Sequence, residues 1–194
     1  LMMAASYLIG SIPFGLIITR IWTGEDIRKY GSGNIGTSNV LRTVGVIPAI
    51  LVLILDVSKG VAAAYLGGAI DSDFGRLLCG IAAIAGHNWS VFLKFKGGKG
   101  IATSAGVLFV VWPTIGLILV GLWVLVVAFS RYISLGSLVV AGTFPILLLI
   151  MGYEWKVVLA GLVLTIFAFS RHVSNFKRLL EGKEYKIGEK VKRQ

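Results

Sequence analysis

A single cysteine, Cys79, is all that this chain contains, and it lies in an apolar segment. One thiol cannot form an intramolecular disulfide and offers no metal-ligand spacing, so Cys79 is expected to pack as an inert apolar group. The first nineteen residues contain neither lysine nor arginine and no clear small-residue cleavage site. They are therefore expected to form a retained membrane span and not a signal peptide.

Acidic residues are also few: nine aspartates and glutamates stand against nineteen lysines and arginines, which gives a net charge of +10. No cluster of carboxylates suggests a metal site, so neither a metal nor another cofactor is expected. The positive charge suits anionic lipid and phosphorylated metabolites. Nucleic acid is not an expected partner, because the sequence offers no soluble domain and no platform of interleaved aromatic and basic residues.

The chain is unusually rich in apolar residues: 56% of its residues are hydrophobic, and the mean hydropathy is +0.86. A soluble core could not use so much, so the sequence predicts an all-α integral membrane protein. Gly10, Ser11, Pro13 and Gly15 are expected to kink the first span or to admit a close neighbour. The expected apolar runs are residues 1–22, 44–66, about 74–93, 101–129, 133–152 and 155–172, followed by a basic segment at 173–194.

The run at 101–129 decides the number of spans. A helix of that length extends about 43 Å, which is too long for one crossing and too short for two full ones. If the run forms two short helices hinged at Trp112-Pro113, nearly all lysines and arginines fall on one side, as the positive-inside rule favours. We therefore expect a polytopic bundle of seven transmembrane helices, the two central ones shorter, with the N-terminus outside and the C-terminus cytoplasmic. Residues 1–194 are expected to form a single domain with a short basic tail at about 182–194.

The most distinctive polar stretch lies between the third and fourth apolar runs. Within seven residues it contains three lysines and three glycines: Lys94, Lys96, Gly97, Gly98, Lys99 and Gly100. Glycines let successive amides converge on an anion, and ammonium groups supply the opposite charge, so this loop is expected to hold phosphate. Its residue order is not that of a nucleotide-binding P-loop. The alternative is that the lysines are only topology signals, which would not require the packed glycines.

Two further polar stretches fall on the same side in the seven-span topology. The first, 31–42, alternates glycine with Ser, Asn and Thr and ends in Arg42, whose planar fork suits a bidentate phosphate contact. It could also be a flexible loop that ends in a helix N-cap, and both can hold at once. The second follows the last apolar run. On a helix continuing from that run, His172 and Asn175 share a face and Arg178 joins them one turn later, which fits a site for a hydroxyl and a phosphate. The alternative is an ordinary snorkelling interfacial helix.

A few polar residues lie inside the apolar runs or at their ends. Asp56 and Lys59 are three residues apart on one face and are expected to neutralise each other inside the bundle. His87 ends the third run and is expected to be a structural histidine hydrogen-bonded at the membrane boundary. Ser137 is expected to pack between helices, although it could reach the cytoplasmic site.

Together these stretches resemble the signature motifs of the PlsY-type bacterial membrane glycerol-3-phosphate acyltransferases. The resemblance is carried by Gly31 through Arg42, Gly86-His87 through Thr103, and Arg171-His172 through Glu184. The segment from Asp56 to Gly60 is similar to that family's second-span pattern. The match runs in order along essentially the whole chain, with mild departures at Thr37-Ser38 and Asn88-Trp89.

The resemblance implies transfer of a fatty acyl group from acyl phosphate to the 1-hydroxyl of sn-glycerol 3-phosphate. The products would be lysophosphatidic acid and inorganic phosphate, in phospholipid biosynthesis. The substrates would be acyl phosphate and glycerol 3-phosphate, and the surroundings membrane lipid. The enzyme would lie in the bacterial inner membrane with its site toward the cytoplasm, and it is expected to act as a monomer.

The resemblance also assigns roles to residues. Those expected in catalysis are Ser32, Arg42, Lys99, His172 and Asn175. Those expected to bind the substrate phosphates are Gly33, Asn34, Thr37, Asn39, Lys94, Lys96, Gly97, Gly98, Gly100, Thr103, Ser137 and Arg178. Those expected to support the site are Asp56, Lys59, His87 and Glu184. His172 is the expected base, and the alternative is that the leaving phosphate takes the proton while His172 only orients the hydroxyl.

Two patterns of related chemistry are missing. Neither histidine begins an H-x-x-x-x-D pattern, because Phe92 and Lys177 stand where the aspartate would be. The dyad of the thioester-dependent glycerolipid acyltransferases is therefore absent. No serine or cysteine nucleophile motif is evident either, which favours direct attack without an acyl-enzyme.

Two other classes of protein remain open from the residues alone. A transporter of a phosphorylated metabolite would also need cationic, glycine-rich helix breaks, but near the bilayer midplane and usually with internal repeats. A lipid-binding or assembly protein could use the same basic face for anionic headgroups, but it would not need His172 and Asn175 on one helical face.

Overall fold

The computed structural model describes residues 1–69 and 73–189, and within them all regular secondary structure is helical. Helices suit a bilayer because each backbone amide and carbonyl finds its partner within the segment. Asp71 and Ser72 of the acidic turn, and residues 190–194 of the basic tail, lie outside the described residues. The helices are α1 (Met2–Ser11), α2 (Phe14–Thr23), η1 (Ile27–Lys29), α3 (Thr37–Thr43), α4 (Val46–Gly67), α5 (Asp73–Asn88), η2 (Val91–Leu93), α6 (Ile101–Val111), α7 (Pro113–Ser130), α8 (Ile133–Ile150), α9 (Trp155–Arg171) and α10 (Val173–Leu180).

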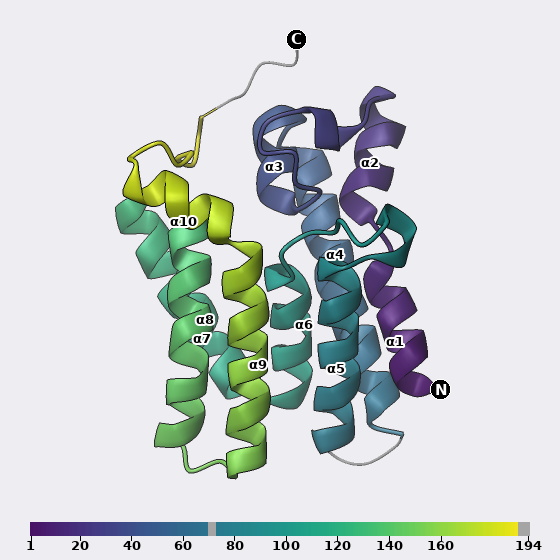
Figure 1. Cartoon of the computed structure of the whole chain (residues 1–194), viewed down its shortest axis with the longest axis vertical. Coiled ribbons are helices and arrows are strands. Elements are labelled where there is room, and N and C mark those ends of the chain that lie inside the picture. The colour runs from purple at the N-terminus through teal and green to yellow at the C-terminus, as the bar shows by residue number, and fades with distance from the viewer. Residues whose placement is uncertain (70–72, 190–194) are drawn as a thin grey trace.

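The long helices lie side by side in one bundle (Figure 1). Within the described residues, five stretches are long and apolar enough to cross a membrane: Met2–Thr23, Val46–Gly67, Asp73–Leu93, Pro113–Ser130 and Ile133–Ile150. A sixth is the pair of α9 and α10, which meets the same test only when taken together. α6 is apolar but has 11 residues. This is the architecture of a multi-pass membrane protein.

The kink predicted in the first span is confirmed. α1 ends at Ser11 and α2 begins at Phe14, with Ile12 and Pro13 between them. Proline lacks an amide hydrogen and cannot continue the helical ladder. The carbonyl of Ile12 accepts a hydrogen bond from Nζ of Lys59, across 3.2 Å.

The hinge predicted at Trp112-Pro113 is confirmed in position. α6 ends at Val111, Trp112 has non-helical backbone angles, and Pro113 opens α7. Only α6 is short, however. α7 has 18 residues, which is about 27 Å of helix, so the expectation of two shorter central helices is wrong for α7. A proline in the first helical position is compatible with a full-length helix after it.

Glycines set the closest approaches between helices. A Cβ added to Gly10 in α1 would lie 2.0 Å from the carbonyl oxygen of Ala83 in α5. A Cβ on Gly60 in α4 would lie 2.1 Å from the carbonyl of Thr103, and one on Gly106 in α6 would lie 2.1 Å from that of Val57. Small residues therefore let these backbones touch, as is usual where helices pack inside lipid.

Apolar side chains fill the interior and also cover the outside. A buried cluster around Trp112 joins α5 to α9 through side chains such as Leu77, Ile115 and Leu148. Many large apolar side chains of the long helices are exposed, including Ile47 of α4. An exposed apolar surface on this scale is suited to contact with lipid.

Three buried ionisable side chains contact one another inside the bundle. The predicted neutralisation of Asp56 by Lys59 is confirmed, with Lys59 Nζ 2.8 Å from Asp56 Oδ1. His87 is buried as well, and its Nδ1 lies 2.7 Å from the same ammonium group.

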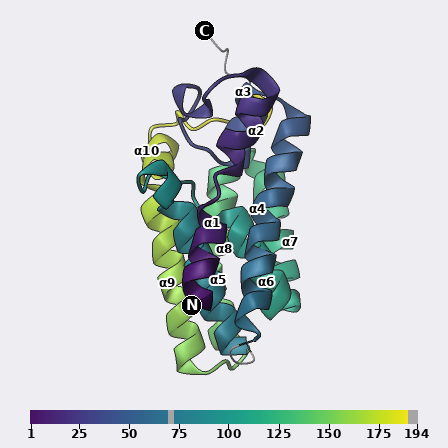
Figure 2. The same cartoon turned by 90° about the vertical axis from the view of Figure 1, so that its right-hand side faces the viewer.

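The loops and short helices that carry the polar stretches gather at one end of the bundle (Figures 1 and 2). The expectation of a helix continuing straight through His172 is wrong: α9 ends at Arg171, and α10 departs from it by 61°. α10 is amphipathic, so by turning it lays Phe176 and Leu179 against the bundle while Arg178 faces the polar end.

Part of the predicted basic tail, residues 184–187, is held against the bundle. Glu184 is buried. The amide of Ile187 donates to the carbonyl of Arg131 across 2.8 Å, and the Arg131 guanidinium donates to the carbonyl of Ile187 across 3.0 Å. These bonds tie residues 184–187 to the junction of α7 and α8.

Candidate active site

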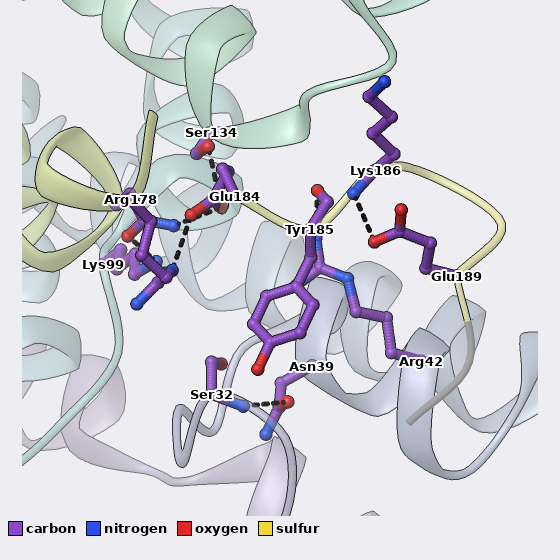
Figure 3. Close-up of polar contacts among 11 residues, drawn as sticks. Ser32, Asn39, Arg42, Lys99, Ser134, Arg178, Glu184, Tyr185, Lys186 and Glu189 are labelled. Atoms are coloured by element: carbon purple, nitrogen blue, oxygen red, sulfur yellow. Dashed lines mark hydrogen bonds and ion pairs between the residues drawn. The ribbon is translucent and has the colours of Figure 1, made fainter. Parts of the chain in front are cut away.

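Asn39 of α3 shapes the loop that precedes it. Its Oδ1 accepts from the amide of Ser32 across 3.0 Å (Figure 3), and its Nδ2 donates to the carbonyls of Asn34 and Tyr30 across 2.8 and 3.1 Å. Asn39 is buried. Its polar atoms are thus occupied by the loop, which makes Asn39 a scaffold for Ser32 and Asn34 and leaves it no free group for phosphate.

The Gly97–Gly98 turn is held by its own backbone. The amide of Gly97 donates to the carbonyl of Asn88 across 3.2 Å, and the amide of Gly98 donates to that of His87 across 2.9 Å. The two amides expected to converge on an anion are therefore already used. The carbonyls of the turn face the other way and accept from Arg171, whose Nη2 and Nε lie 2.9 Å from Gly97 O and 3.0 Å from Gly98 O.

The junction of α9 and α10 places the third polar stretch. His172 is buried and its Nδ1 lies 2.7 Å from the carbonyl of Ala168. A carbonyl can only accept, so Nδ1 carries a proton, and in the neutral ring Nε2 keeps its lone pair. Asn175 is also buried; its Oδ1 accepts from Nζ of Lys99, and its Nδ2 donates to Glu184 across 2.7 Å.

Glu184, in the segment after α10, connects α8 and α10. Its Oε1 accepts from Asn175 Nδ2 and, across 2.9 Å, from Ser134 Oγ of α8. Its Oε2 accepts from Nε of Arg178 across 2.7 Å. Figure 3 shows Ser134 and Arg178 on Glu184. The buried carboxylate therefore orients Asn175 and Arg178 and offsets part of the local positive charge, as expected of a supporting residue.

Tyr185 brings Arg42 and Arg178 to one ring. The guanidinium carbon of Arg42 lies 4.9 Å from the ring centroid and that of Arg178 lies 5.7 Å from it. Arg42 also donates to the carbonyl of Tyr185 across 3.3 Å. The two cations are thus held near each other by an aromatic face, which attracts both.

Between these elements lies a cavity of about 250 Å³. It is lined by Ser32, Asn34, Lys99, Ser170, Arg171, Val173, Ser174 and Arg178. Three of these side chains are cations, no carboxylate is among them, and the hydroxyls and the amide can donate hydrogen bonds. A cavity with this lining suits an anion that accepts several hydrogen bonds, such as a phosphate ester.

Lys99 is the most perturbed cation of the cavity. Burial lowers its pKa to about 8, Glu184 opposes this shift, and Arg178, Arg42 and Arg171 add to it. A bound phosphate would stabilise the charged form and reverse part of the shift.

Other residues predicted to bind phosphate do not line this cavity. Lys94 and Lys96 are exposed, and Ser137 Oγ donates to the carbonyl of Ile133 within α8. Thr103 is buried in α6, and the amide of Gly33 donates to Tyr30 O. Gly100 lies at the N-cap of α6 in the left-handed region, and Thr37 is the first residue of α3.

Ser170, Arg171 and Ser174 line the cavity although they were not predicted as site residues. The bend at His172 changes which side chains share a face, and no proline or glycine in 168–178 signals it. The only indication in the sequence was that Arg171, a cation, directly precedes His172.

An apolar groove of about 370 Å³ lies between α8, α9 and α10. Its lining comprises Leu135, Leu138, Val139, Phe169, Phe176, Leu179 and Leu180. α10 contributes Ser174 and Arg178 to the polar cavity and Phe176, Leu179 and Leu180 to the groove. One short helix thus borders a polar and an apolar compartment, which suits a ligand with both characters. Among the described residues, no three His, Cys, Asp or Glu side chains are grouped as a metal site would require.

Comparison with known proteins identifies the family. The model of the family described as glycerol-3-phosphate acyltransferase matches residues 1–182. The curated glycerol-3-phosphate acyltransferase 2 of Moorella thermoacetica is 46% identical over 190 residues, 98% of each chain. The glycerol-3-phosphate acyltransferase of Thermoanaerobacter sp. is 46% identical over 186 residues, 96% of this chain and 94% of the relative.

Solved structures agree. The crystal structure of PlsY, an integral membrane glycerol 3-phosphate acyltransferase, in its glycerol 3-phosphate form superposes with a TM-score of 0.91 at 35% identity. Its lysophosphatidic acid form superposes with a TM-score of 0.88 at 34% identity. Each alignment covers 96% of this chain and 94% of the other. This chain therefore belongs to the glycerol-3-phosphate acyltransferase family.

Proposed function

We propose that this enzyme transfers a fatty acyl group from acyl phosphate to the 1-hydroxyl of sn-glycerol 3-phosphate. The products are lysophosphatidic acid and inorganic phosphate. The observation that carries the proposal is the cation-lined cavity beside an apolar groove, with α10 between them. Support also comes from the relatives, which are named for glycerol 3-phosphate, and from a PlsY structure in a lysophosphatidic acid form.

The cavity holds the phosphate of glycerol 3-phosphate and the departing phosphate of the donor. Lys99, Arg171 and Arg178 supply charge, while Ser32, Asn34 and Ser174 supply hydrogen-bonding groups. Arg42 lies behind Tyr185 and adds a fourth cation near the cavity. Charge-assisted hydrogen bonds of this kind are stronger than neutral ones. They are stronger still in a cavity that is shielded from bulk water.

The groove holds the acyl chain. Its lining is apolar and it opens beside the bundle, so a chain can enter from the surrounding lipid. Burying each methylene is worth about 0.8 kcal/mol relative to water. Because the chain comes from lipid, that gain is small here, and the groove mainly sets the position and length of the acyl group.

The reaction is a direct displacement. The 1-hydroxyl oxygen attacks the carbonyl carbon of the mixed anhydride, the new ester bond forms, and the bond between the carbonyl carbon and the phosphate oxygen breaks. The leaving phosphate takes the proton of the hydroxyl and departs as hydrogen phosphate. An acyl phosphate has a good leaving group, so the protein contributes mainly positioning and electrostatic stabilisation.

We assign His172 an orienting role and the leaving phosphate that of proton acceptor. The leaving phosphate is itself a proton acceptor next to the reacting hydroxyl, so the displacement does not require a base from the protein. His172 is buried. With Nδ1 bonded to Ala168, its Nε2 is left to accept a hydrogen bond. Asn175, fixed between Lys99 and Glu184, holds the neighbouring cation in place.

The enzyme lies in a bacterial inner membrane with seven spans. These are the five long stretches, the short α6 and the bent pair of α9 and α10. The N-terminus is outside and the C-terminus is cytoplasmic, which puts the cation-rich loops and the active site at the cytoplasmic face, as the positive-inside rule favours. It acts as a monomer and a single domain, in which segments from residue 32 to residue 178 meet at one cavity.

A donor comparison tests the proposal. Purified protein in lipid vesicles is given palmitoyl phosphate, palmitoyl-CoA or palmitoyl-acyl carrier protein, each with and without glycerol 3-phosphate. We expect equal amounts of lysophosphatidic acid and inorganic phosphate from palmitoyl phosphate, only when glycerol 3-phosphate is present. If a thioester gives product at an equal rate, the assignment of acyl phosphate as the donor is wrong. If folded protein gives no product with any of the donors, the proposed reaction is wrong.

A further inference from the structure

Three buried ionisable side chains lie beneath the site and have no role in the reaction described above. Asp56 and Lys59 of α4 and His87 of α5 form what we call the buried ionic cluster, and each is at most 4% exposed. Ionisable groups inside a membrane protein are costly and are usually retained for a function. A buried ion pair is weak evidence for stability, because apolar replacements are often tolerated as well.

Lys59 is the centre of the buried ionic cluster. Its Nζ lies 2.8 Å from Asp56 Oδ1, 2.7 Å from His87 Nδ1 and 3.2 Å from the carbonyl of Ile12. An ammonium group has three N–H donors and here it has three acceptors. Lys59 therefore joins the break between α1 and α2 to α4 and α5.

The cluster fixes the ring of His87. An ammonium group can only donate, so Nδ1 of His87 accepts and the ring proton is on Nε2. The Nε2 edge packs directly on the Gly97–Gly98 turn, since a Cβ added to Gly98 would lie 2.1 Å from Nε2. The carbonyl of the same histidine accepts from the amide of Gly98 across 2.9 Å.

The turn is held from its other side by the cavity. Arg171 donates to the carbonyls of Gly97 and Gly98 across 2.9 and 3.0 Å. Lys99 is the next residue along the chain, and both Arg171 and Lys99 line the cavity. A displacement of the turn would therefore move two of the three cations that face the substrate.

We propose that the buried ionic cluster positions the anion-binding cavity. By holding the His87 ring against the Gly97–Gly98 turn, Lys59 and Asp56 determine where Lys99 and Arg171 stand relative to the substrate phosphate. Lys59, Asp56 and His87 are thus positioning residues, and none of them is among the side chains that line the cavity. The inference rests on the proposed function, because it assigns that cavity to the phosphate of glycerol 3-phosphate.

The test replaces the charged pair by neutral residues of similar size. Asp56→Asn with Lys59→Met leaves no unpaired buried charge, so the double variant is expected to fold. Without the ammonium group the His87 ring is no longer fixed. We expect the KM for glycerol 3-phosphate to rise about 10- to 100-fold, the scale on which small displacements cost activity, while kcat changes much less.

A matched control removes a half-buried polar contact between helices elsewhere. Thr165 of α9 donates to the carbonyl of Ala141 in α8 across 2.7 Å, away from the turn. Thr165→Val should lower the thermal midpoint and leave the KM unchanged. If the double variant has the KM of the wild type, the cluster is only structural and the inference is wrong.

A second variant covers the case in which the double variant does not fold. His87→Asn keeps an acceptor for Lys59 but withdraws the ring edge from Gly98, so the same rise in KM is expected, and an unchanged KM overturns the inference. Binding of radiolabelled glycerol 3-phosphate is measured alongside. Failure of the wild type to make product refutes the proposed function, whereas an active wild type with unaffected variants refutes only the positioning role.

Discussion

Single residues of the three polar stretches divide into those that face the cavity and those that build it. Ser32, Asn34, Lys99 and Arg178 line the cavity. The side chains of Asn39, Asn175 and Glu184 form hydrogen bonds with other groups of the protein. Residue type alone does not separate the two groups, because an asparagine suits a ligand and a loop equally.

Lys99 should give the enzyme an alkaline limit. Burial lowers its pKa to about 8, so the free enzyme loses this positive charge as the pH rises through that value. The phosphate ester has already lost its second proton by then, since that pKa is about 6. We predict that kcat/KM for glycerol 3-phosphate falls above pH 8.

Lys99→Arg should move that limit upward, because the guanidinium stays charged to above about pH 12. Its overall kcat/KM should be lower, since an arginine does not fit the place of a lysine. Rate against pH in wild type and Lys99→Arg measures both effects. An alkaline fall at the same pH in both proteins would show that another group is responsible.

His172→Gln distinguishes orientation from proton transfer. Glutamine keeps a polar group near the position of Nε2 but cannot act as a base. If His172 orients the hydroxyl, kcat should fall by no more than about tenfold, whereas a general base contributes about 10²–10⁴-fold. Steady-state kcat at saturating substrates, with a thermal midpoint to verify folding, decides between them.

At the scale of elements, the sequence predicts breaks that have a local chemical cause. Pro13 and Pro113 lack an amide hydrogen, which favours a break in the helix, and the chain breaks near both, although Pro145 lies inside α8 without ending it. The bend at His172 has no such residue. It arises because α10 is amphipathic and packs across the bundle, which is a tertiary effect, and this is why Arg171 and Ser174 were not predicted.

The loop of Gly97 and Gly98 shows the same limit. The segment with three glycines among three lysines reaches the cavity through Lys99. Sequence cannot show that the amides bond to His87 and Asn88 or that Lys94 and Lys96 point elsewhere, because these depend on the helix that packs beneath.

The groove between α8, α9 and α10 should control acyl-chain length. Leu138→Trp adds bulk inside the groove, so activity should shift from palmitoyl to shorter acyl phosphates, with little change in the KM for glycerol 3-phosphate. Leu149→Trp, at an exposed position of the same helix, is the control and should change neither. Rates across a series of acyl phosphates provide the measurement, and equal losses at all lengths would contradict this role.

For the whole molecule, the sequence predicts the class of protein and the close packing of its helices well. It predicts the membrane topology only from the placement of lysines and arginines. Apolar composition and length are local properties, and the membrane bundle follows from them. The short helices and loops that carry the polar stretches lie at one end of the bundle (Figures 1 and 2), and three cations line the cavity there. This argues against a transporter, whose site would lie near the middle of the bundle.

Single cysteines test the proposed orientation. In a Cys79→Ser background, Lys96→Cys and Met151→Cys place one thiol at each end of the bundle, both at exposed positions. A membrane-impermeant thiol reagent added to intact spheroplasts should label K96C poorly and M151C readily. If the reagent labels K96C from outside, the proposed topology is the wrong way round.

The central claim is that one cavity, and not the basic face in general, binds the phosphate of glycerol 3-phosphate. Lys99 and Lys94 belong to the same loop, but only Lys99 lines the cavity, while Lys94 is exposed. The most direct test is therefore the dissociation constant of radiolabelled glycerol 3-phosphate for wild type, Lys99→Met and Lys94→Met in identical vesicles.

Loss of a charged hydrogen bond costs about 1.5–3 kcal/mol, which corresponds to roughly 10- to 100-fold in affinity. We predict a loss of that size for Lys99→Met and wild-type affinity for Lys94→Met. Equal weakening by the two substitutions would mean that diffuse surface charge holds the substrate, and it would contradict the assignment of the phosphate to this cavity.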